Sequence, residues 1–303
     1  MSPLLGAHMS VAGGLPLAVE RAVAHRCDAF QIFAKNANQW RGRVVPPEEI
    51  RDFRAKVQSA GIGPVVSHAS YLINLATTND VLRRQSIEAL GDEMDRAEAL
   101  GLLGVVLHPG CYTRGNEADA PGLIADALTQ ALRARAGGRT MILLEQTAGQ
   151  GTSIGGRFEH LAEILARAHD HARLGVCLDT CHLLAAGYDV CSPEGYAETF
   201  EQFGRLVGFS RLTLFHLNDS KKPLGSRVDR HEHIGQGCLG LEPFRRLVND
   251  PRFSTLPMLL ETPKTEGRGP RVVAVDPLDE QNLMTLRGLI AGHSNRRLTD
   301  LPT

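Results

Sequence analysis

Eight short apolar runs recur along the chain, and longer amphipathic segments separate them. Several runs are continuous hydrophobic stretches without polar alternation, which is typical of strands buried on both faces of a parallel sheet. The runs are Leu4–Ala7, Phe30–Phe33, Pro64–Ser67, Val105–Leu107, Met141–Leu144, Gly175–Leu178, Leu212–Phe215 and Met258–Leu260. The pattern therefore predicts parallel strands joined by long connections.

Three of the connecting segments have a clear helical pattern. In residues 80–100, apolar side chains recur every three or four positions, and Gly101 follows as a stop signal. Residues 46–61 begin with two prolines and two glutamates, which favour a first helical turn. Residues 277–289 are predicted to form the last helix.

The alternation of strands and helices predicts a single domain over residues 1–303. Alternation argues for a parallel sheet, and eight units argue for a closed (β/α)8 TIM barrel. A doubly wound open sheet is the alternative, but residues 9–14, Met-Ser-Val-Ala-Gly-Gly, do not form the glycine-rich phosphate turn of that fold. We expect a flexible loop at residues 266–270 and loose order after about residue 293.

Composition limits the classes of protein that the chain can represent. Its formal net charge is −1, so a nucleic-acid partner would need a local basic patch. The six cysteines include no C-x-x-C pair, which favours reduced thiols. No run approaches the ~20 apolar residues of a membrane span, and the first ten residues lack the features of a signal peptide. We expect a cytoplasmic protein with neither a membrane nor an obligate protein partner.

Seven of the eight apolar runs are followed directly by a histidine or a carboxylate. These types account for only 12 and 34 of the 303 residues, so chance rarely produces the pattern. Any one of them alone is more often a packing or capping residue. In a parallel barrel, however, all the carboxyl ends of the strands open on one face, where these side chains would repel one another without cations. The residues are His8, His68, His108, Glu145, Asp179, His216 and Glu261. They predict a metal site at the C-terminal mouth of the barrel.

Two further pairs join this group. His182 follows Asp179 by three residues at the start of a turn, and Asp229 and His231 alternate in the polar stretch GSRVDRHEHIGQG. In extended backbone, alternating side chains point to the same side. We therefore place residues 225–237 at the same mouth.

The mixture of donors indicates the kind of metal. Imidazoles with a few carboxylates suit zinc, with manganese or iron as substitutes, whereas magnesium prefers oxygen ligands. Five imidazoles and four carboxylates are too many for one tetrahedral ion and would serve two or three. Three divalent ions and four carboxylates sum to about +2 (+6 − 4), which attracts phosphate, and multi-metal sites commonly catalyse phosphoryl displacement.

Several blocks of the sequence resemble endonuclease IV, the zinc-dependent apurinic/apyrimidinic endonucleases of base excision repair. The blocks are GAHMSVAGGL, HASYLINLA, LHPG, EQTAGQG, GVCLDTCHLLAAGYD, HLNDSKKPLGSRVDRHEHIGQG and LLETPK, between Gly6 and Lys264. The resemblance implies a (β/α)8 barrel with three zinc ions at its mouth.

The ligands that the resemblance implies are all present. His68 and His108 match ligands of the first zinc, and Glu145 bridges it to the second. Asp179, His216 and Glu261 complete the second set. His182, Asp229 and His231 match the third. His8 matches no ligand position and is expected to support or cap the site, and Glu232 and His233 match none either.

The implied activity is that of a deoxyribonuclease IV of the phage-T4-induced type. Such an enzyme cleaves duplex DNA on the 5′ side of an abasic site, leaves a 3′-hydroxyl and cleans blocked 3′ ends. Hydroxide held between the first two zinc ions attacks the phosphate in line, and the third stabilises the departing 3′-oxygen. Glu145 and Glu261 are the residues to which the resemblance assigns catalysis, with Glu261 orienting the nucleophile.

The resemblance also places two loops against DNA, where the family flips the abasic nucleotide out of the duplex. The expected contacts are Lys35, Asn38, Trp40, Tyr71, Leu72, Arg227 and Arg230, and Lys221 and Lys222 are weaker candidates. Asn38 departs from the family pattern, because well-known members carry an arginine there. A shorter neutral side chain puts lesion affinity, or its salt dependence, in question.

Two alternatives remain open from the sequence. A metal-dependent sugar isomerase or epimerase on a similar barrel would hold one or two ions, mostly through carboxylates, in a closed pocket. A non-catalytic lesion-binding protein would have lost ligands, and none is missing. Zinc stoichiometry separates the nuclease from the isomerase.

Overall fold

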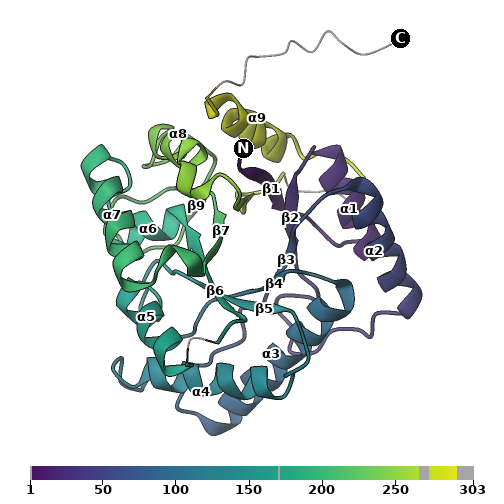
Figure 1. Cartoon of the computed structure of the whole chain (residues 1–303), viewed down its shortest axis with the longest axis vertical. Helices are drawn as coiled ribbons and strands as arrows, with labels where there is room; N and C mark the ends of the chain where they lie inside the picture. The colour runs from purple at the N-terminus through teal and green to yellow at the C-terminus, as the bar shows by residue number, and fades with distance from the viewer. Residues whose placement is uncertain (1, 170, 266–272, 292–303) are drawn as a thin grey trace.

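The computed structural model describes residues 2–169, 171–265 and 273–291, and eight parallel strands close a barrel at its centre (Figure 1). Around the barrel the order is β1, β10, β7, β6, β5, β4, β3 and β2. The strands are β1 (Leu4–His8), β2 (Ala29–Ile32), β3 (Val65–His68), β4 (Gly104–Leu107), β5 (Met141–Glu145), β6 (Leu174–Asp179), β7 (Leu212–His216) and β10 (Pro257–Leu260). The predicted (β/α)8 barrel is confirmed, and the doubly wound sheet is not formed.

Helices surround the barrel on its outside (Figure 1). They are α1 (Leu15–Ala24), α2 (Pro47–Ala60), α3 (Asp80–Leu100), α4 (Ala120–Arg133), α5 (Phe158–Arg167), α6 (Thr180–Ala186), α7 (Pro193–Leu206), α8 (Glu242–Asn249) and α9 (Pro277–Leu289), with short 3-10 turns η1 (Phe209–Arg211) and η2 (Pro251–Phe253). The three predicted helices are α2, α3 and α9. The α3 helix begins after Asn79, whose side chain accepts hydrogen bonds from two backbone N–H groups, and ends at Gly101 with φ 72°.

Two apolar layers hold the fold. The larger layer lies between strands and helices, and the smaller fills the barrel interior. The interior layer consists of Ala29, Val66, Val106, Leu143, Cys177, Leu214 and Leu259, one from each of seven strands. The eighth strand supplies Gly6, where a β-carbon would lie 1.7 Å from the carbonyl oxygen of Ala29. Only glycine fits this close approach between β1 and β2.

A two-stranded antiparallel sheet, not predicted from the sequence, lies beyond the barrel strands. It pairs β8 (Asp219–Ser220) with β9 (His231–Glu232). Among the described residues, no helix is both long and apolar enough to cross a membrane. The loop predicted at residues 266–270 and the loose order predicted after about residue 293 fall outside the described residues.

Candidate metal centre

A ring of eight polar side chains lies directly above the interior apolar layer. Successive side chains of a strand point to opposite faces, so the residue two positions after an interior residue also points inward. Counting two positions from Val66, Val106 and Leu143 gives His68, His108 and Glu145. The complete ring is His8, Gln31, His68, His108, Glu145, Asp179, His216 and Glu261. Strand alternation therefore explains why the residues at the strand ends converge.

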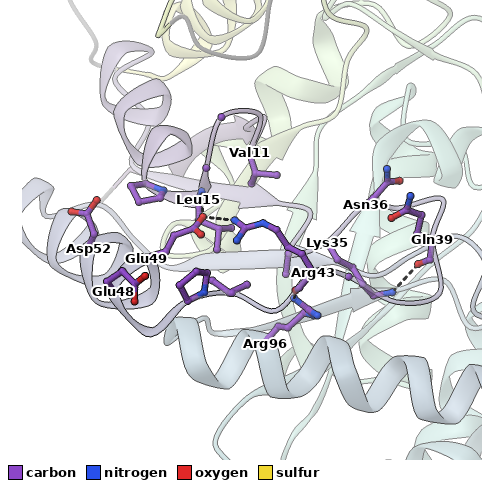
Figure 2. Close-up of a pocket in the computed structure, with 17 residues that line it drawn as sticks. Val11, Leu15, Lys35, Asn36, Gln39, Arg43, Glu48, Glu49, Asp52 and Arg96 are labelled. Carbon is purple, nitrogen blue, oxygen red and sulfur yellow. Dashed lines mark hydrogen bonds and ion pairs between the residues drawn. The ribbon is translucent and has the colours of Figure 1, made fainter.

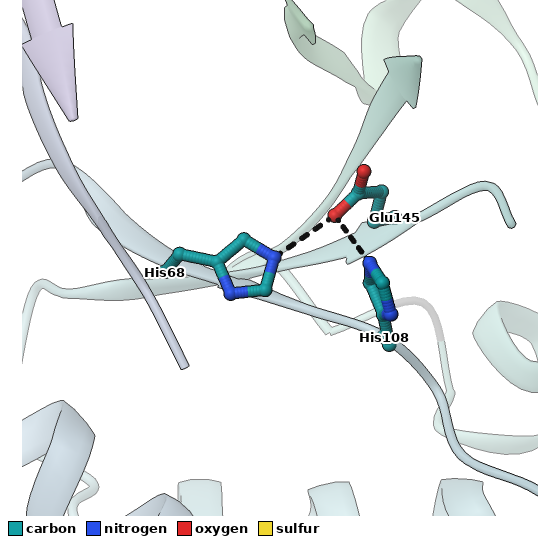
Figure 3. Close-up of side chains that lie close together, drawn as sticks. All are labelled: His68, His108 and Glu145. Atoms are coloured by element: carbon teal, nitrogen blue, oxygen red, sulfur yellow. Dashed lines mark hydrogen bonds and ion pairs between the residues drawn. The ribbon is translucent and has the colours of Figure 1, made fainter. Parts of the chain in front are cut away.

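Glu145 contacts three imidazoles of this ring and is fully buried. Its Oε2 lies 3.2 Å from Nε2 of His68 and 3.1 Å from Nε2 of His108 (Figure 3). Its other oxygen, Oε1, lies 3.0 Å from Nδ1 of His216. Glu261 approaches the same His216 atom through Oε2, at 3.2 Å. The two oxygens of Glu145 thus face two different groups of donors.

A second cluster lies at the rim, where α6 meets the loop before β9. The carboxylate of Asp179 accepts a hydrogen bond from the backbone N–H of His182 at 3.0 Å and so begins α6. Nε2 of His182 is 3.2 Å from Oδ2 of Asp229, and Nε2 of His231 is 3.2 Å from Oδ1. Asp229 is partly exposed, unlike Glu145 and Asp179. This cluster is the more open part of the site.

The loop that carries Asp229 is fastened on both sides. Arg227, at φ 54°, donates from Nε to the carbonyl of Gly149 at 2.7 Å, which ties the loop to the segment after β5. The carboxylate of Asp219 accepts four backbone N–H groups, from Ser220, Gly235, Gly237 and Leu239. A loop held in this way presents Asp229 and His231 in a fixed direction. Glu232 and His233 form bonds elsewhere, His233 with Asn282, as expected for residues that match no ligand position.

Three sets of donor atoms are close enough to share a metal ion. Within each set, the possible ligand atoms lie within 4.8 Å of one another. The sets are His68, His108 and Glu145; Glu145, Asp179, His216 and Glu261; and His182, Asp229 and His231. They have the same membership as the three sets implied by the sequence resemblance. Two other groups include Cys177 or Cys181, but burial raises the pKa of both thiols to about 12, which disfavours the thiolate form that metals bind.

The pKa values of His182, His231 and Glu145 are shifted by interactions with their neighbours. Burial disfavours a charged His231, yet the carboxylates of Asp179 and Asp229 raise its pKa to about 9. The pKa of His182 is likewise raised, against burial, by Asp179 and Asp229. Burial would raise the pKa of Glu145, but His216 and His108 lower it well below the ordinary value. The carboxylates therefore favour positive charge beside them, which is what a divalent cation would supply.

The imidazoles are oriented as metal ligands usually are. A ligating histidine normally donates its other ring N–H to a fixed acceptor. Nδ1 of His68 lies 2.8 Å from the carbonyl of Ala69, and Nδ1 of His182 lies 2.8 Å from that of Gln146. Nδ1 of His231 lies 3.2 Å from the carbonyl of Glu261, while its Nε2 faces the carboxylate of Asp229. These residues fit divalent metal ions that accept imidazole and carboxylate ligands.

A cleft of about 590 Å³ opens above the donor sets. Tyr71 lines it, and its exposed ring lies 5.1 Å from that of His68, centroid to centroid. Arg230 also lines the cleft and is exposed, as are Asn38 and Arg227, whereas Leu72 is half-buried. Trp40 is half-buried against the apolar core. The predicted DNA contacts thus lie on loops at the mouth, with varying exposure.

Lys35 is the exception among them, and its assignment is corrected. Its side chain is 1% exposed, and Nζ lies 3.0 Å from Oε1 of Glu93, whose side chain is equally buried. Nζ also donates to the carbonyl of Gln39, at the edge of a separate cleft of about 1090 Å³ (Figure 2). An ammonium buried against its own counter-ion is not offered to phosphate. Lys35 instead anchors the loop between β2 and α2.

Sequence reasoning missed Gln31, the eighth member of the ring. The apolar run Phe30–Phe33 predicts a strand there, and an apolar pattern gives its glutamine no role. The observed strand is Ala29–Ile32, and Gln31 is fully buried. Counting the alternation from the small residue Ala29 would have revealed it.

The fold places the chain in a known class. A model of the xylose isomerase-like TIM barrel family matches residues 19–281. The structure of D-psicose 3-epimerase with D-fructose aligns with a TM-score of 0.66, over 95% of this chain and 100% of that chain, at 13% identity. At that level of identity the likeness concerns the fold alone.

Closer relatives define the family. A probable endonuclease 4 of Chloroflexus aurantiacus is 52% identical over 290 residues, covering 96% of this chain and 99% of that protein. A probable endonuclease 4 of Geobacter sulfurreducens is 45% identical over 300 residues, 99% of each. The crystal structure of endonuclease IV from Thermus thermophilus aligns with a TM-score of 0.81 at 42% identity, over 95% of this chain and 98% of that chain. The chain belongs to the endonuclease IV family.

Proposed function

We propose that the chain is a DNA-repair endonuclease of base excision repair. It hydrolyses the phosphodiester bond 5′ to an abasic site in duplex DNA, leaves a 3′-hydroxyl and removes blocked 3′ ends. The observation that carries the proposal is the nine-residue donor set, grouped in three, beneath a cleft at the barrel mouth. Family membership supports the same substrate and a site in the cytoplasm.

The metal ligands would be the nine residues of the three donor sets, and zinc is the metal that suits them, with manganese or iron as substitutes. They are His68, His108, Glu145, Asp179, His182, His216, Asp229, His231 and Glu261. Divalent ions held there supply a deprotonated water near neutral pH and positive charge for the developing phosphate and leaving oxygen. Three ions per chain would balance the four carboxylates and leave charge for a phosphate.

The chain's own residues would orient this chemistry. Glu145 faces two donor groups at once and so fixes their separation. Glu261 reaches the same His216 atom from the other side and is the residue proposed to orient the nucleophile. Tyr71 and Leu72 are proposed to contact the opened duplex beside the lesion, because unstacking is least costly where a base is missing. Asn38, Trp40, Arg227 and Arg230 are the proposed partners of the DNA backbone and gap.

The epimerases that share this fold suggest a second function, but the donor set disfavours it. A sugar isomerase needs one or two ions, whereas three donor sets are present here, two of which share Glu145. The rim set of His182, Asp229 and His231 serves no evident purpose in a small closed pocket. A non-catalytic lesion-binding protein would not need a complete set.

A nicking assay tests the proposal directly. Purified protein is expected to nick duplex DNA that carries a tetrahydrofuran abasic analogue, without added magnesium, and to contain about three zinc ions per chain. Brief EDTA treatment should leave activity intact, and a stronger zinc chelator should remove it. A 3′-phosphorylated nick provides the substrate for end cleaning. An unchanged nicking rate in Glu261→Gln would show the proposed mechanism to be wrong, and epimerisation of ketoses without nicking would favour the alternative.

A further inference from the structure

Gln31 occupies the one ring position that is neither imidazole nor carboxylate. Its side chain is fully buried, and all of its polar contacts are with residues of the metal centre or with His8. Burying an amide costs free energy unless its hydrogen bonds are made. A residue that served only to fill the barrel interior would be apolar, as in the layer below. The hydrogen bonds of the amide therefore explain why a polar residue lies at this position.

The contacts of Gln31 define the hydrogen-bonding state of its neighbours. The amide NH2 group donates to Oε1 of Glu261, because an ionised carboxylate only accepts. The amide oxygen then faces Nε2 of His216 at 2.9 Å, and this nitrogen must carry a proton. The other ring nitrogen, Nδ1, is left facing Glu145 and Glu261, at 3.0 and 3.2 Å. His8 accepts the second amide proton through Nδ1 at 3.0 Å, which fixes the orientation of the amide.

His216 differs in this respect from three other imidazoles of the centre. His68, His182 and His231 are each oriented by a backbone carbonyl. His216 is oriented by a side chain, and that side chain also holds Glu261. One residue thus aligns two ligands of the same donor set.

We propose that Gln31 is a positioning residue of the metal centre, which fixes Nδ1 of His216 as the ligand atom and turns Oε2 of Glu261 toward the same ion. This inference rests on the proposed function, because it assumes that the set of Glu145, Asp179, His216 and Glu261 holds a metal. Hydrogen-bond partners behind metal ligands typically contribute about 10–100-fold to metal affinity. The expected consequence is a selective loss of affinity at one of three sites.

The test compares Gln31→Met with a matched packing variant, Leu259→Met. Gln31→Met keeps the length of the side chain and removes its hydrogen bonds, whereas Leu259→Met changes packing in the interior layer below Glu261. Zinc content is measured during titration with a competing chelator, and thermal unfolding is measured on the metal-free proteins. Gln31→Met is expected to weaken one zinc ion by about 10–100-fold and to leave the affinity of the other two unchanged, and Leu259→Met to retain all ions at wild-type affinity. Unchanged zinc affinity in Gln31→Met would overturn the proposal, as would equal weakening of all three ions together with a destabilised metal-free protein.

A spectroscopic measurement on the unaltered protein does not depend on how the variants fold. Long-range nitrogen–proton correlation spectra of the zinc-loaded protein should show the proton of His216 on Nε2. A proton on Nδ1 would contradict the proposal. If the wild-type protein holds zinc and nicks DNA, and Gln31→Met has unchanged zinc affinity, this inference alone is refuted. If the wild-type protein holds no zinc, the proposed function is refuted as well.

Discussion

Two parts of the molecule bury charge, and they balance it differently. Lys35 and Glu93 form an ion pair with both side chains 1% exposed. In the metal centre, the ion-pair partners of Glu145, Asp179, Asp229 and Glu261 within the described residues are all imidazoles. The first site contains a permanently charged group, the ammonium of Lys35, whereas in the described part of the chain the carboxylates of the metal centre are paired only with histidines.

The balanced pair holds two loops together. Glu93 accepts the backbone N–H of Ser70 in the loop after β3, and Lys35 donates to carbonyls of Gln39 and Trp40 in the loop after β2. Removing both charges from water costs about as much as their attraction returns, so the pair fixes positions more than it adds stability. The metal centre has the opposite character, because its excess of carboxylates calls for cations from outside the chain. A buried charged cluster therefore indicates a functional site when the chain supplies no permanent counter-charge for it.

The largest expected effect comes from altering the unbalanced site at Glu145. Glu145→Gln removes the charge that faces two donor sets, so we expect fewer than three bound zinc ions. Because bound metal contributes several kcal/mol to such reactions, nicking should fall by about 10³-fold or more. Single-turnover nicking and zinc analysis measure both effects.

Glu232→Gln is the matched control, since Glu232 neighbours the rim ligands but faces its own loop. It should retain zinc and activity. Full activity in Glu145→Gln, or equal losses in the two variants, would contradict the assignment.

The second prediction removes one charge of the Lys35–Glu93 ion pair. Glu93→Gln leaves the Lys35 ammonium buried without its counter-ion, which should lower the free energy of unfolding by about 3–5 kcal/mol. The double variant Lys35→Met/Glu93→Leu removes both charges and should cost much less. Urea unfolding of the metal-free proteins measures the difference. Glu163→Gln, which breaks an exposed pair with Arg167, should change stability by only about 1 kcal/mol or less.

These two sites also show what sequence alone reveals. The strands and most ligands could be predicted, because an apolar run and a chemically distinctive residue at its end are local signals. Glu145 and His216 needed only the rule that parallel strands end at one face. The ring position of Gln31 was missed because glutamine has no distinctive chemistry, and its role follows from three partners far away in the sequence.

Lys35 was misassigned for a related reason. A lysine in a polar loop normally lies in solvent, and nothing local marks it as buried. Its partner Glu93 lies within α3, on a helix face that contacts two loops only after the barrel closes. Long-range pairing of this kind, like the pairing of β8 with β9, depends on tertiary structure.

The third prediction concerns cations that remain exposed above the unbalanced site. Arg230 lines the cleft with an exposed side chain, in contrast to the buried Lys35. Arg230→Ala should weaken DNA binding and reduce the salt dependence of log K by about one unit. The double variant Lys35→Met/Glu93→Leu should leave that slope unchanged, because the buried pair that it removes carries no net charge. Fluorescence anisotropy between low and moderate salt measures both slopes. Equal slopes for Arg230→Ala and wild type would remove Arg230 from the DNA interface.

The smallest expected effect adds a cation where the loop anchored by Lys35 meets solvent. Asn38 is exposed, and its backbone N–H is bonded to the side chain of Asn36 within the same loop. Asn38→Arg leaves that bond intact and should raise affinity for an abasic duplex, with a salt slope steeper by at most about one unit. Gln58→Arg, on an exposed position near the end of α2, adds the same charge away from the mouth and should leave affinity unchanged. Equal gains in the two variants would mean that net charge, and not the position of residue 38, controls binding. A gain confined to Asn38→Arg would identify this loop as part of the DNA interface and residue 38 as a position that controls lesion affinity.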